Sequence, residues 1–364
     1  MFRIDGIATF RVRGDAVEAQ YYHLENERLT CSLCPRKCTI KDGNVGWCGV
    51  RKREGNRLIA LTYGKISSIH PDPIEKKPLY HFMPGSATFS LGSIGCNLGC
   101  QHCQNWTISQ TKGEDESLRL RSITPEEVIK DAQKAHCPSI ALTYNEPSIW
   151  FEFAKDIAQE AHKNGLKVIF VTNGYVSQEP AMEIGSFIEA ANVDVKAFTD
   201  RFYREICHGK IDPIRRSVKI WIESKVHVEL TYLVIPTHND SEEEIRQFSR
   251  WAIDVGGENL PVHFSRFFPH FKMNDLGPTP VATVHRVREI AKEEGLQYVY
   301  VGNIADGGNN TRCSNCNSLL MERTGFSVEI KGFDMENLAC MKCGTAIPII
   351  GPIKDNPGRK RWWR

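Results

Sequence analysis

The sequence TFSLGSIGCNLGCQHCQNW, residues 88–106, places Cys96, Cys100 and Cys103 on one short loop after an apolar run. Thiolates ligate soft metals, and a loop this short can bring all three onto one iron–sulfur cluster, whereas a closed zinc or iron–sulfur site normally has four protein ligands. One iron is then left open to another molecule. The alternative is a structural zinc loop with a distant fourth Cys, although the next Cys along the chain form groups of their own.

The length and composition predict one large domain with two smaller units, because 364 residues with 41% hydrophobic content exceed one ordinary domain. The formal charge of +2 gives no sign of a polyanionic partner, so nucleic acid is not implied. No apolar run approaches the ~20 residues of a membrane span, and the first 15 residues lack a signal-peptide core. We therefore expect a cytoplasmic protein without membrane contact.

Eleven of the thirteen Cys fall into three groups, which in a reducing compartment indicates metal ligands. The first group, Cys31, Cys34, Cys38 and Cys48, can close a metal site, and its spacing leaves zinc and a second iron–sulfur cluster equally open. Such a filled site is structural or carries electrons. The two Cys outside the groups, Cys137 and Cys207, are expected to be ordinary buried or semi-buried thiols.

From residue 88 onward, β-rich runs alternate with helical patterns, which indicates βα units and a parallel sheet. Capping boxes begin helices at Thr124 and Ser241, and Gly165 ends another. The predicted strands are residues 88–94, 139–143, 167–172, 192–197, 226–234, 260–267 and 297–302.

Polar residues follow the carboxyl ends of these strands, which is typical of the catalytic face of a βα barrel. Each is by itself as consistent with a turn as with a site, but the repetition favours a site. The run after the second strand includes Tyr144, Asn145 and Glu146, the run after the third includes Asn173, and Asp194 and Lys196 end the fourth.

Near the carboxyl terminus, Cys313 and Cys316 form one CxxC pair and Cys340 and Cys343 another, on either side of a predicted hairpin. This layout predicts a zinc-ribbon-like unit whose metal supplies folding free energy. The predicted domains are residues 1–87 with the first Cys group, 88–305 as the barrel, 306–350 as the ribbon and 351–364 as a basic tail with two Trp.

A set of motifs in order, CSLCPRKC, DPIEKKPLYHFMPGS, GCNLGCQHCQNW, ALTYNEPSIWFEF, VTNGY, DVKAF, HFSRFFPHFKM and YVYVGN, resembles the radical S-adenosylmethionine (radical SAM) proteins of the AmmeMemoRadiSam group, relatives of pyruvate formate-lyase activating enzymes. The resemblance implies an α/β fold with a partial (β/α) barrel and a [4Fe-4S] cluster bound by Cys96, Cys100 and Cys103. It also implies that S-adenosylmethionine (SAM) binds the open iron through its amino and carboxylate groups. By the same analogy, the cofactor-binding residues are His102, Asn145, Glu146, Asn173, Asp194 and Lys196. A mutual salt bridge is the alternative role of Asp194 and Lys196.

The resemblance implies a mechanism in which an electron donor of the flavodoxin or ferredoxin type reduces the cluster, SAM is cleaved to a 5′-deoxyadenosyl radical, and the radical abstracts hydrogen from a substrate. The substrate itself, a protein or a small molecule, is not evident from the sequence. One alternative is an activating enzyme for a glycyl radical enzyme, and others are a zinc-binding adaptor without catalysis and a closed-shell methyltransferase. We expect the two metal-binding units to fold over the barrel mouth as lids.

Overall fold

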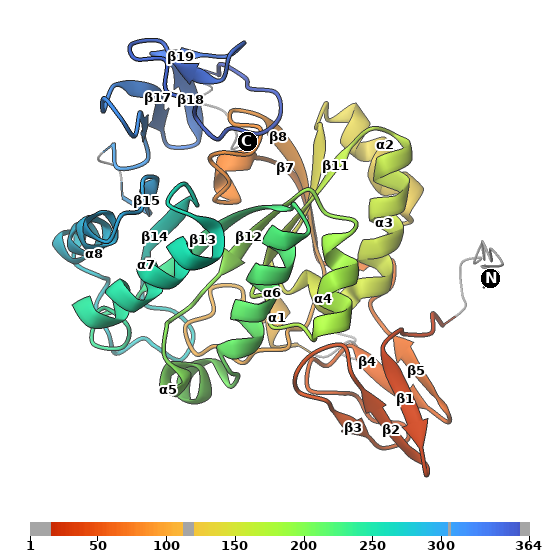
Figure 1. Cartoon of the computed structure of the whole chain (residues 1–364). Helices are drawn as coiled ribbons and strands as arrows, with labels where there is room; N and C mark the ends of the chain where they lie inside the picture. The colour runs from red at the N-terminus through yellow and green to blue at the C-terminus, as the bar shows by residue number, and fades with distance from the viewer. Residues whose placement is uncertain (1–15, 112–119, 305–306, 357–364) are drawn as a thin grey trace, which may run out of the picture.

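The computed structural model describes residues 16–111, 120–304 and 307–356, and its centre is an eight-stranded sheet (Figure 1). The strand order is β15-β14-β13-β12-β11-β10-β8-β7. Seven strands are parallel and stand in chain order, and β7 pairs antiparallel with β8. Because β7 and β15 lie at opposite edges, the sheet is open, which agrees with the predicted partial barrel. The strands are β7 (Ser68–Pro73), β8 (Ala87–Gly92), β10 (Ser139–Leu142), β11 (Lys167–Thr172), β12 (Ala190–Asp194), β13 (His227–Val234), β14 (Val262–Arg266) and β15 (Val299–Gly302).

The predicted strands all form, and the largest shift is at β12, which ends at Asp194 rather than at residue 197. The backbone leaves the sheet there because the N–H of Lys196 donates to the hydroxyl of Tyr203 at 2.9 Å instead of to a neighbouring strand. β7 lies within the region predicted as the amino-terminal unit, yet it is an edge strand of the central sheet.

Helices on the outside of the sheet connect successive strands (Figure 1). The capping box at Thr124 is present, and Gly165 follows α3 in a left-handed conformation with φ of 71°. The second predicted box is only half right: Ser241 caps α7, but the carboxylate of Glu244 accepts from Phe198 N and the hydroxyl of Tyr232. The helices are α1 (Trp106–Ser109), α2 (Pro125–Lys134), η2 (Pro147–Trp150), α3 (Phe151–Lys163), α4 (Gln178–Gly185), α5 (Asp200–Phe202), η3 (Tyr203–Cys207), α6 (Asp212–Glu223), α7 (Glu242–Gly256) and α8 (Val281–Glu293). Among the described residues, no helix combines the length and the apolar character that a membrane span needs.

The segment 74–83, which begins with η1 (Ile74–Lys76), fills the amino-terminal end of the barrel interior. Its apolar side chains pack against Ala141, Ile169 and Ala190, which are neighbours in the parallel register of three strands. The buried carboxylate of Glu229 on β13 accepts from the backbone N–H groups of residues 80 and 81, at 3.0 and 2.7 Å. We call this segment the plug.

The amino-terminal Cys unit is a set of small antiparallel pairings at the carboxyl-terminal end of the barrel strands (Figure 1). Its Leu33 carbonyl accepts from Ser177 N at 3.0 Å, and the buried Arg51 pairs with Glu152 of α3 at 3.1 Å. Its strands are β1 (Tyr22–Glu25), β2 (Arg28–Cys31), β3 (Thr39–Ile40), β4 (Arg51–Glu54) and β5 (Arg57–Ala60), and the short pair β6 (Lys65–Ile66) with β9 (Arg121–Ser122) follows.

The carboxyl-terminal Cys unit has the predicted hairpin, and it lies at the opposite end of the barrel (Figure 1). Its core includes Tyr298 and Tyr300 of the last barrel strand region and Tyr80 of the plug. The expectation that this unit is a lid over the barrel mouth is therefore wrong. Its strands are β16 (Thr311–Arg312), β17 (Leu319–Thr324), β18 (Ser327–Ile330), β19 (Phe333–Asp334) and β20 (Ala339–Cys340). Both Trp of the basic tail, the first 15 residues and the predicted boundary at 305–306 lie outside the described residues.

Candidate functional site

A cavity of about 540 Å³ opens at the carboxyl-terminal ends of the barrel strands. Its wall contains all three Cys of the loop that follows β8, together with side chains from the ends of β10, β11, β12 and β13. All the residues predicted to bind the cofactor lie on this wall: His102, Asn145, Glu146, Asn173, Asp194 and Lys196.

Asn145 fastens the start of the Cys loop to the strand beside it. Its Oδ1 accepts from Ser93 N at 3.0 Å, and its Nδ2 donates to the carbonyls of Ile94 and Gly95 at 2.9 and 3.0 Å. One side chain thus fixes three successive backbone units just before Cys96. The structure gives Asn145 the role of positioning the loop.

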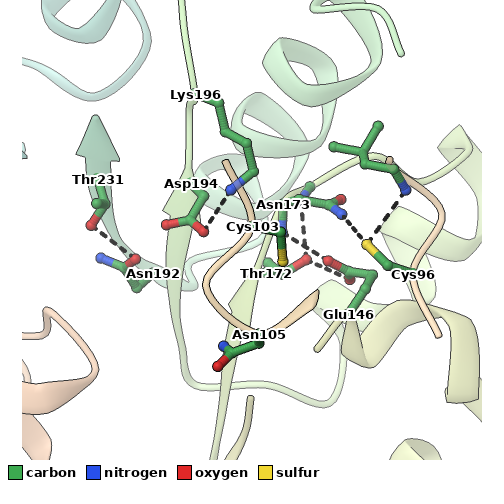
Figure 2. Close-up of polar contacts among 12 residues, drawn as sticks. Cys96, Cys103, Asn105, Glu146, Thr172, Asn173, Asn192, Asp194, Lys196 and Thr231 are labelled. Atoms are coloured by element: carbon green, nitrogen blue, oxygen red, sulfur yellow. Dashed lines mark hydrogen bonds and ion pairs between the residues drawn. The ribbon is translucent and has the colours of Figure 1, made fainter. Parts of the chain in front are cut away.

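Asn173 connects the third barrel strand to the first thiol (Figure 2). Its Nδ2 lies 3.5 Å from Cys96 Sγ and donates to Asn97 Oδ1 at 2.9 Å. Leu98 N also points at Cys96 Sγ, at 3.4 Å. Such donors stabilise a thiolate, the form in which Cys ligates a metal.

The carboxylate of Glu146 is nearly inaccessible to solvent and accepts hydrogen bonds from other groups of the barrel (Figure 2). It accepts from Ser148 N at 2.9 Å, Thr172 Oγ1 at 2.7 Å and Asn173 N at 2.8 Å. Burial raises its pKa, although these donors act in the opposite direction. Glu146 therefore ties the ends of β10 and β11 together below the Cys loop.

Asp194 and Lys196 form an ion pair with Oδ2 and Nζ 3.0 Å apart (Figure 2). Burial opposes the charge on Lys196, but the negative charge of Asp194, and of Cys100 and Cys207 when they are thiolates, holds its pKa well above the usual range. Both side chains reach the cavity wall, and the Asp194 side chain is 38% exposed. The pair can therefore present a charged surface to a ligand while remaining paired.

His102 and Cys207 lie beside the second thiol of the loop. Ligand atoms of Cys100, His102 and Cys207 all lie within 4.8 Å of one another. Burial lowers the pKa of His102 to about 3, so its imidazole is neutral. Cys207 ends η3 and is fully buried, as predicted, but its position beside Cys100 was not predicted because the two are far apart in the sequence.

This wall fits an iron–sulfur cluster with an open iron. Three thiols from one loop face one cavity, donors aim at Cys96 Sγ, and the Cys103 Sγ lies 3.1 Å from Ser109 Oγ. The cavity volume lies in the range of small-molecule and cofactor sites, so a ligand as large as SAM can be accommodated beside the loop.

The four Cys of the amino-terminal unit converge on a second, much smaller cavity. Cys31, Cys34, Cys38 and Cys48 all line it, with Arg51 and Trp47 beside them. Cys48 also contacts the Cys loop: a Cβ added to Gly95 would lie only 2.4 Å from the Cys48 carbonyl oxygen. The first metal group therefore packs directly against the residue that precedes Cys96.

The sulfurs of Cys313, Cys316, Cys340 and Cys343 lie within 4.8 Å of one another. Cys313 Sγ is 3.5 Å from Cys343 Sγ, and Cys316 Sγ is 3.6 Å from Cys340 Sγ. Four thiols on two adjoining turns match a tetrahedral metal site. The cluster confirms that these four residues come together, as the two CxxC pairs predicted.

Lys76, Lys77 and Tyr144 also line the cavity. Tyr144 belongs to the polar run after the second predicted strand, whereas neither lysine was predicted to lie at the site. The motifs DPIEKKPLYHF and LTYNEP contain them, but nothing in either motif shows that the two segments meet. Tyr144 has a φ of 71°, a conformation that is unusual for an aromatic residue and that tends to be found at functional sites.

Comparison with known proteins gives one family and several relatives. The model of the radical SAM superfamily matches residues 91–249. Uncharacterized protein MJ0808 of Methanocaldococcus jannaschii is 40% identical over 335 residues, which is 92% of this chain and 99% of that protein. Pyruvate formate-lyase 1-activating enzyme of Escherichia coli K12 is 21% identical over 224 residues, which is 57% of this chain and 89% of that protein. A crystal structure of Streptococcus suis SuiB is 14% identical with a TM-score of 0.47, and the match covers 63% of this chain and 52% of that chain.

Proposed function

The chain belongs to the radical SAM superfamily, and we propose that it is a cytoplasmic enzyme that cleaves SAM reductively and abstracts a hydrogen atom from a substrate held in the barrel cavity. The convergence of Cys96, Cys100 and Cys103 on the cavity wall supports this proposal. When bound, the [4Fe-4S] cluster and SAM supply a 5′-deoxyadenosyl radical after one-electron reduction.

The chain's own residues bind the cluster, orient SAM and shield the site of hydrogen abstraction from water. The three thiols hold the cluster, Asn145 fixes the backbone before them, and Asn173 donates toward Cys96 Sγ. The Asp194–Lys196 pair offers a carboxylate and an ammonium group to the charged groups of SAM. Enclosure by the barrel keeps water away from the site of hydrogen abstraction.

Within the superfamily, we assign the chain to the AmmeMemoRadiSam group on the motifs quoted above. An activating role toward a glycyl radical enzyme is the second candidate, and the distant similarity to pyruvate formate-lyase 1-activating enzyme favours it. Two lids over the barrel mouth would favour a substrate other than a glycyl radical enzyme, whose peptide loop needs an open mouth. Only the amino-terminal unit lies near that end, so this argument is weakened. The choice between these candidates therefore depends on the substrate experiment.

The other two Cys groups are proposed to hold metal as well. Cys313, Cys316, Cys340 and Cys343 suit zinc, because the four thiols form a closed tetrahedral site. Cys31, Cys34, Cys38 and Cys48 suit zinc or a second iron–sulfur cluster. A flavodoxin-type or ferredoxin-type donor is the proposed source of the electron. A zinc-binding adaptor would need closed zinc sites in all three groups, and the large cavity beside the Cys loop argues against it.

The test is the release of 5′-deoxyadenosine and methionine by the anaerobically reconstituted full chain with a low-potential reductant and SAM. The triple replacement of Cys96, Cys100 and Cys103 by Ala should abolish release, and Cys137→Ala is the matched control because Cys137 is a buried thiol outside the three groups. Full release by the triple variant would exclude the proposed function. Release of S-adenosylhomocysteine in place of 5′-deoxyadenosine would indicate a methyltransferase.

A glycyl radical partner and other substrates are distinguished by following deuterium. Turnover with deuterated cell extract should transfer deuterium into 5′-deoxyadenosine, and fractionation then identifies the donor. A persistent glycyl doublet in the electron paramagnetic resonance spectrum of a protein donor would establish the activating role. Deuterium transfer without that signal would favour another substrate.

A further inference from the structure

The cavity has a second charged end, which lies away from the Cys loop. Lys76 and Lys77 of the plug line the same cavity as the three thiols. Asp72, which binds both lysines, stands opposite Thr88 at the start of β8, whereas the Cys loop begins after Gly92 at the end of that strand. Four residue steps of a strand correspond to roughly 13 Å. The cavity therefore extends from the thiols to the lysines of the plug.

Lys77 is held in place by two other residues. Its Nζ lies 2.7 Å from Asp72 Oδ2 and 4.5 Å from the centre of the Tyr144 ring. The Tyr144 hydroxyl donates to the same Asp72 oxygen. Tyr144 can lie there because position 92 is glycine: a Cβ at Gly92 would lie 2.9 Å from Tyr144 Cβ. The left-handed backbone of Tyr144 and the absence of a side chain at Gly92 thus both allow the Tyr144 ring to lie against Lys77.

Among the residues that the structure describes, Asp72 is the carboxylate that pairs with Lys77. Its Oδ2 accepts one of the donors of Lys77, and its Oδ1 lies 2.8 Å from Lys76 Nζ. The Lys77 side chain is 2% exposed, and an ammonium group has three N–H donors. A buried ammonium with spare donors on a cavity wall is costly unless a ligand completes its coordination. Other charged groups on the wall already have partners, since Glu146 accepts three hydrogen bonds and Asp194 pairs with Lys196.

We propose that Lys77 is a substrate-positioning residue, whose ammonium group binds a carboxylate or phosphate oxygen of the substrate while Asp72 and Tyr144 orient it. This inference rests on the proposed function, because it takes the cluster end of the cavity to be the site of hydrogen abstraction. A substrate anchored at Lys77 extends toward the Cys loop, so the anchor would set which hydrogen faces the cofactor. The substrate class is accordingly an anionic molecule or an acidic side chain.

Anion binding at Lys77 should also depend on pH. Burial lowers the pKa of Lys77 to about 8, and Asp72 opposes that shift while Lys76 adds to it. Burial raises the pKa of Tyr144, which faces the same ammonium, so Tyr144 stays neutral in this range. Because Lys77 is charged only below its pKa, anion binding should weaken as the pH rises through about 8.

Two small anions test the proposal, orthophosphate and [1-13C]acetate, with the full chain carrying its reduced, paramagnetic cluster and S-adenosylhomocysteine, which has no sulfonium to be cleaved. Nuclear magnetic resonance line broadening of each probe reports binding close to the cluster. The wild type should broaden at least one probe, and Lys77→Met should weaken its binding about tenfold or more, as expected for the loss of one charge-assisted hydrogen bond. Which probe is broadened distinguishes a phosphate site from a carboxylate site. Lys130→Met, at an exposed lysine of α2, is the matched control.

Several outcomes would overturn the anion site. These are no broadening of either probe by the wild type, equal broadening by Lys77→Met, or displacement of the probe as S-adenosylhomocysteine is raised, which would mean that Lys77 serves the carboxylate of SAM. If Lys77→Met does not fold, Asp72→Asn replaces it: loss of the neighbouring carboxylate lowers the pKa of Lys77 further, so probe binding should weaken at a lower pH than in the wild type, and an unchanged pH dependence would contradict the proposal.

The proposed function is checked on the same protein preparation, with SAM in place of S-adenosylhomocysteine, by 5′-deoxyadenosine release from the wild type. Release without Lys77-dependent binding would overturn the anion site alone. Absence of release from protein that carries the cluster would overturn the proposed function, whatever the probes do.

Discussion

The two outer Cys groups each bring four thiols together, yet they lie at opposite ends of the barrel and have different neighbours (Figure 1). The amino-terminal group packs on the loop that holds the proposed cluster, through Cys48 and Gly95. The carboxyl-terminal group packs on the plug and β15. The position of a Cys group relative to the Cys loop therefore decides whether that group can affect SAM cleavage, although both groups offer four thiols.

The contacts at the two ends differ in kind as well. Arg36 of the amino-terminal unit donates to the carbonyls of Asn97 and His208, which belong to the Cys loop and to the turn after η3. At the other end, Arg323 lies 4.2 Å from the centre of the Tyr80 ring and donates to the Tyr80 carbonyl at 3.0 Å. The first set of contacts shapes the cluster loop. The second set holds the plug in the barrel.

The largest expected difference is between paired Cys substitutions in the two groups. Cys34→Ser with Cys48→Ser should lower 5′-deoxyadenosine release by roughly 100-fold, about 2.7 kcal/mol in activation free energy, because the loop before Cys96 loses its support. The measurement is single-turnover release together with the cluster absorption spectrum. The same double change at Cys316 and Cys343 is the control. Equal losses in the two variants would contradict the comparison.

A single methyl group tests the contact between the amino-terminal unit and the loop. Gly95 has a φ of +81°, and its added Cβ would collide with Cys48 O and Val50 Cγ1. Gly43 has a φ of +76° with nothing within 4 Å of its added Cβ, so Gly43→Ala carries the backbone strain of ~1 kcal/mol without the collision. Gly95→Ala should lower 5′-deoxyadenosine release about tenfold, whereas Gly43→Ala should not change it beyond about twofold. Similar rates for both variants would show that the contact is unimportant.

Arg36 should have a smaller effect. Arg36→Met removes two hydrogen bonds to backbone carbonyls but keeps an apolar stem near Trp47, over which the guanidinium lies at 3.9 Å. Because Arg36 is partly exposed, water can replace some of the lost bonds, and we expect release to fall about three- to fivefold. Arg28→Met, on the exposed surface of β2, is the control. A loss as large as that of the Gly95 variant would mean that Arg36, rather than Cys48, is the main contact.

The sequence predicted what depends on local spacing. The Cys loop, the two CxxC pairs and the positions of the seven parallel strands along the chain follow from residues close together in the sequence, and each is present in the structure. The Asn145 role was not predictable, because its partners are backbone groups of the Cys loop, and any residue has those.

Tertiary packing decided the remainder of the site. Asp72, Lys77 and Tyr144 come from a strand, a short helix end and a loop that only the folded barrel brings together. The proximity of Cys207 to Cys100 arises in the same way, across more than one hundred residues. The ribbon was expected at the barrel mouth because it directly follows the barrel in the chain. Its position in the chain does not show which end of β15 it packs against, and that is decided by tertiary contacts.

The smallest expected effect on SAM cleavage comes from the ribbon. Cys316→Ser with Cys343→Ser should change 5′-deoxyadenosine release by less than about twofold, because the four ribbon thiols lie at the far end of the barrel from the Cys loop. The melting temperature should fall by several degrees, since ~1 kcal/mol corresponds to about 2–4 °C in a domain of this size and metal binding stabilises such a unit.

The ribbon still reaches the cavity through the plug, where Ile350 exchanges backbone hydrogen bonds with His81 and Met83. Loosening of the ribbon should therefore weaken phosphate or acetate binding at Lys77 more than it slows SAM cleavage, and both can be measured on one preparation. A ribbon variant that loses SAM cleavage and keeps anion binding would reverse the roles assigned here to the two ends of the barrel.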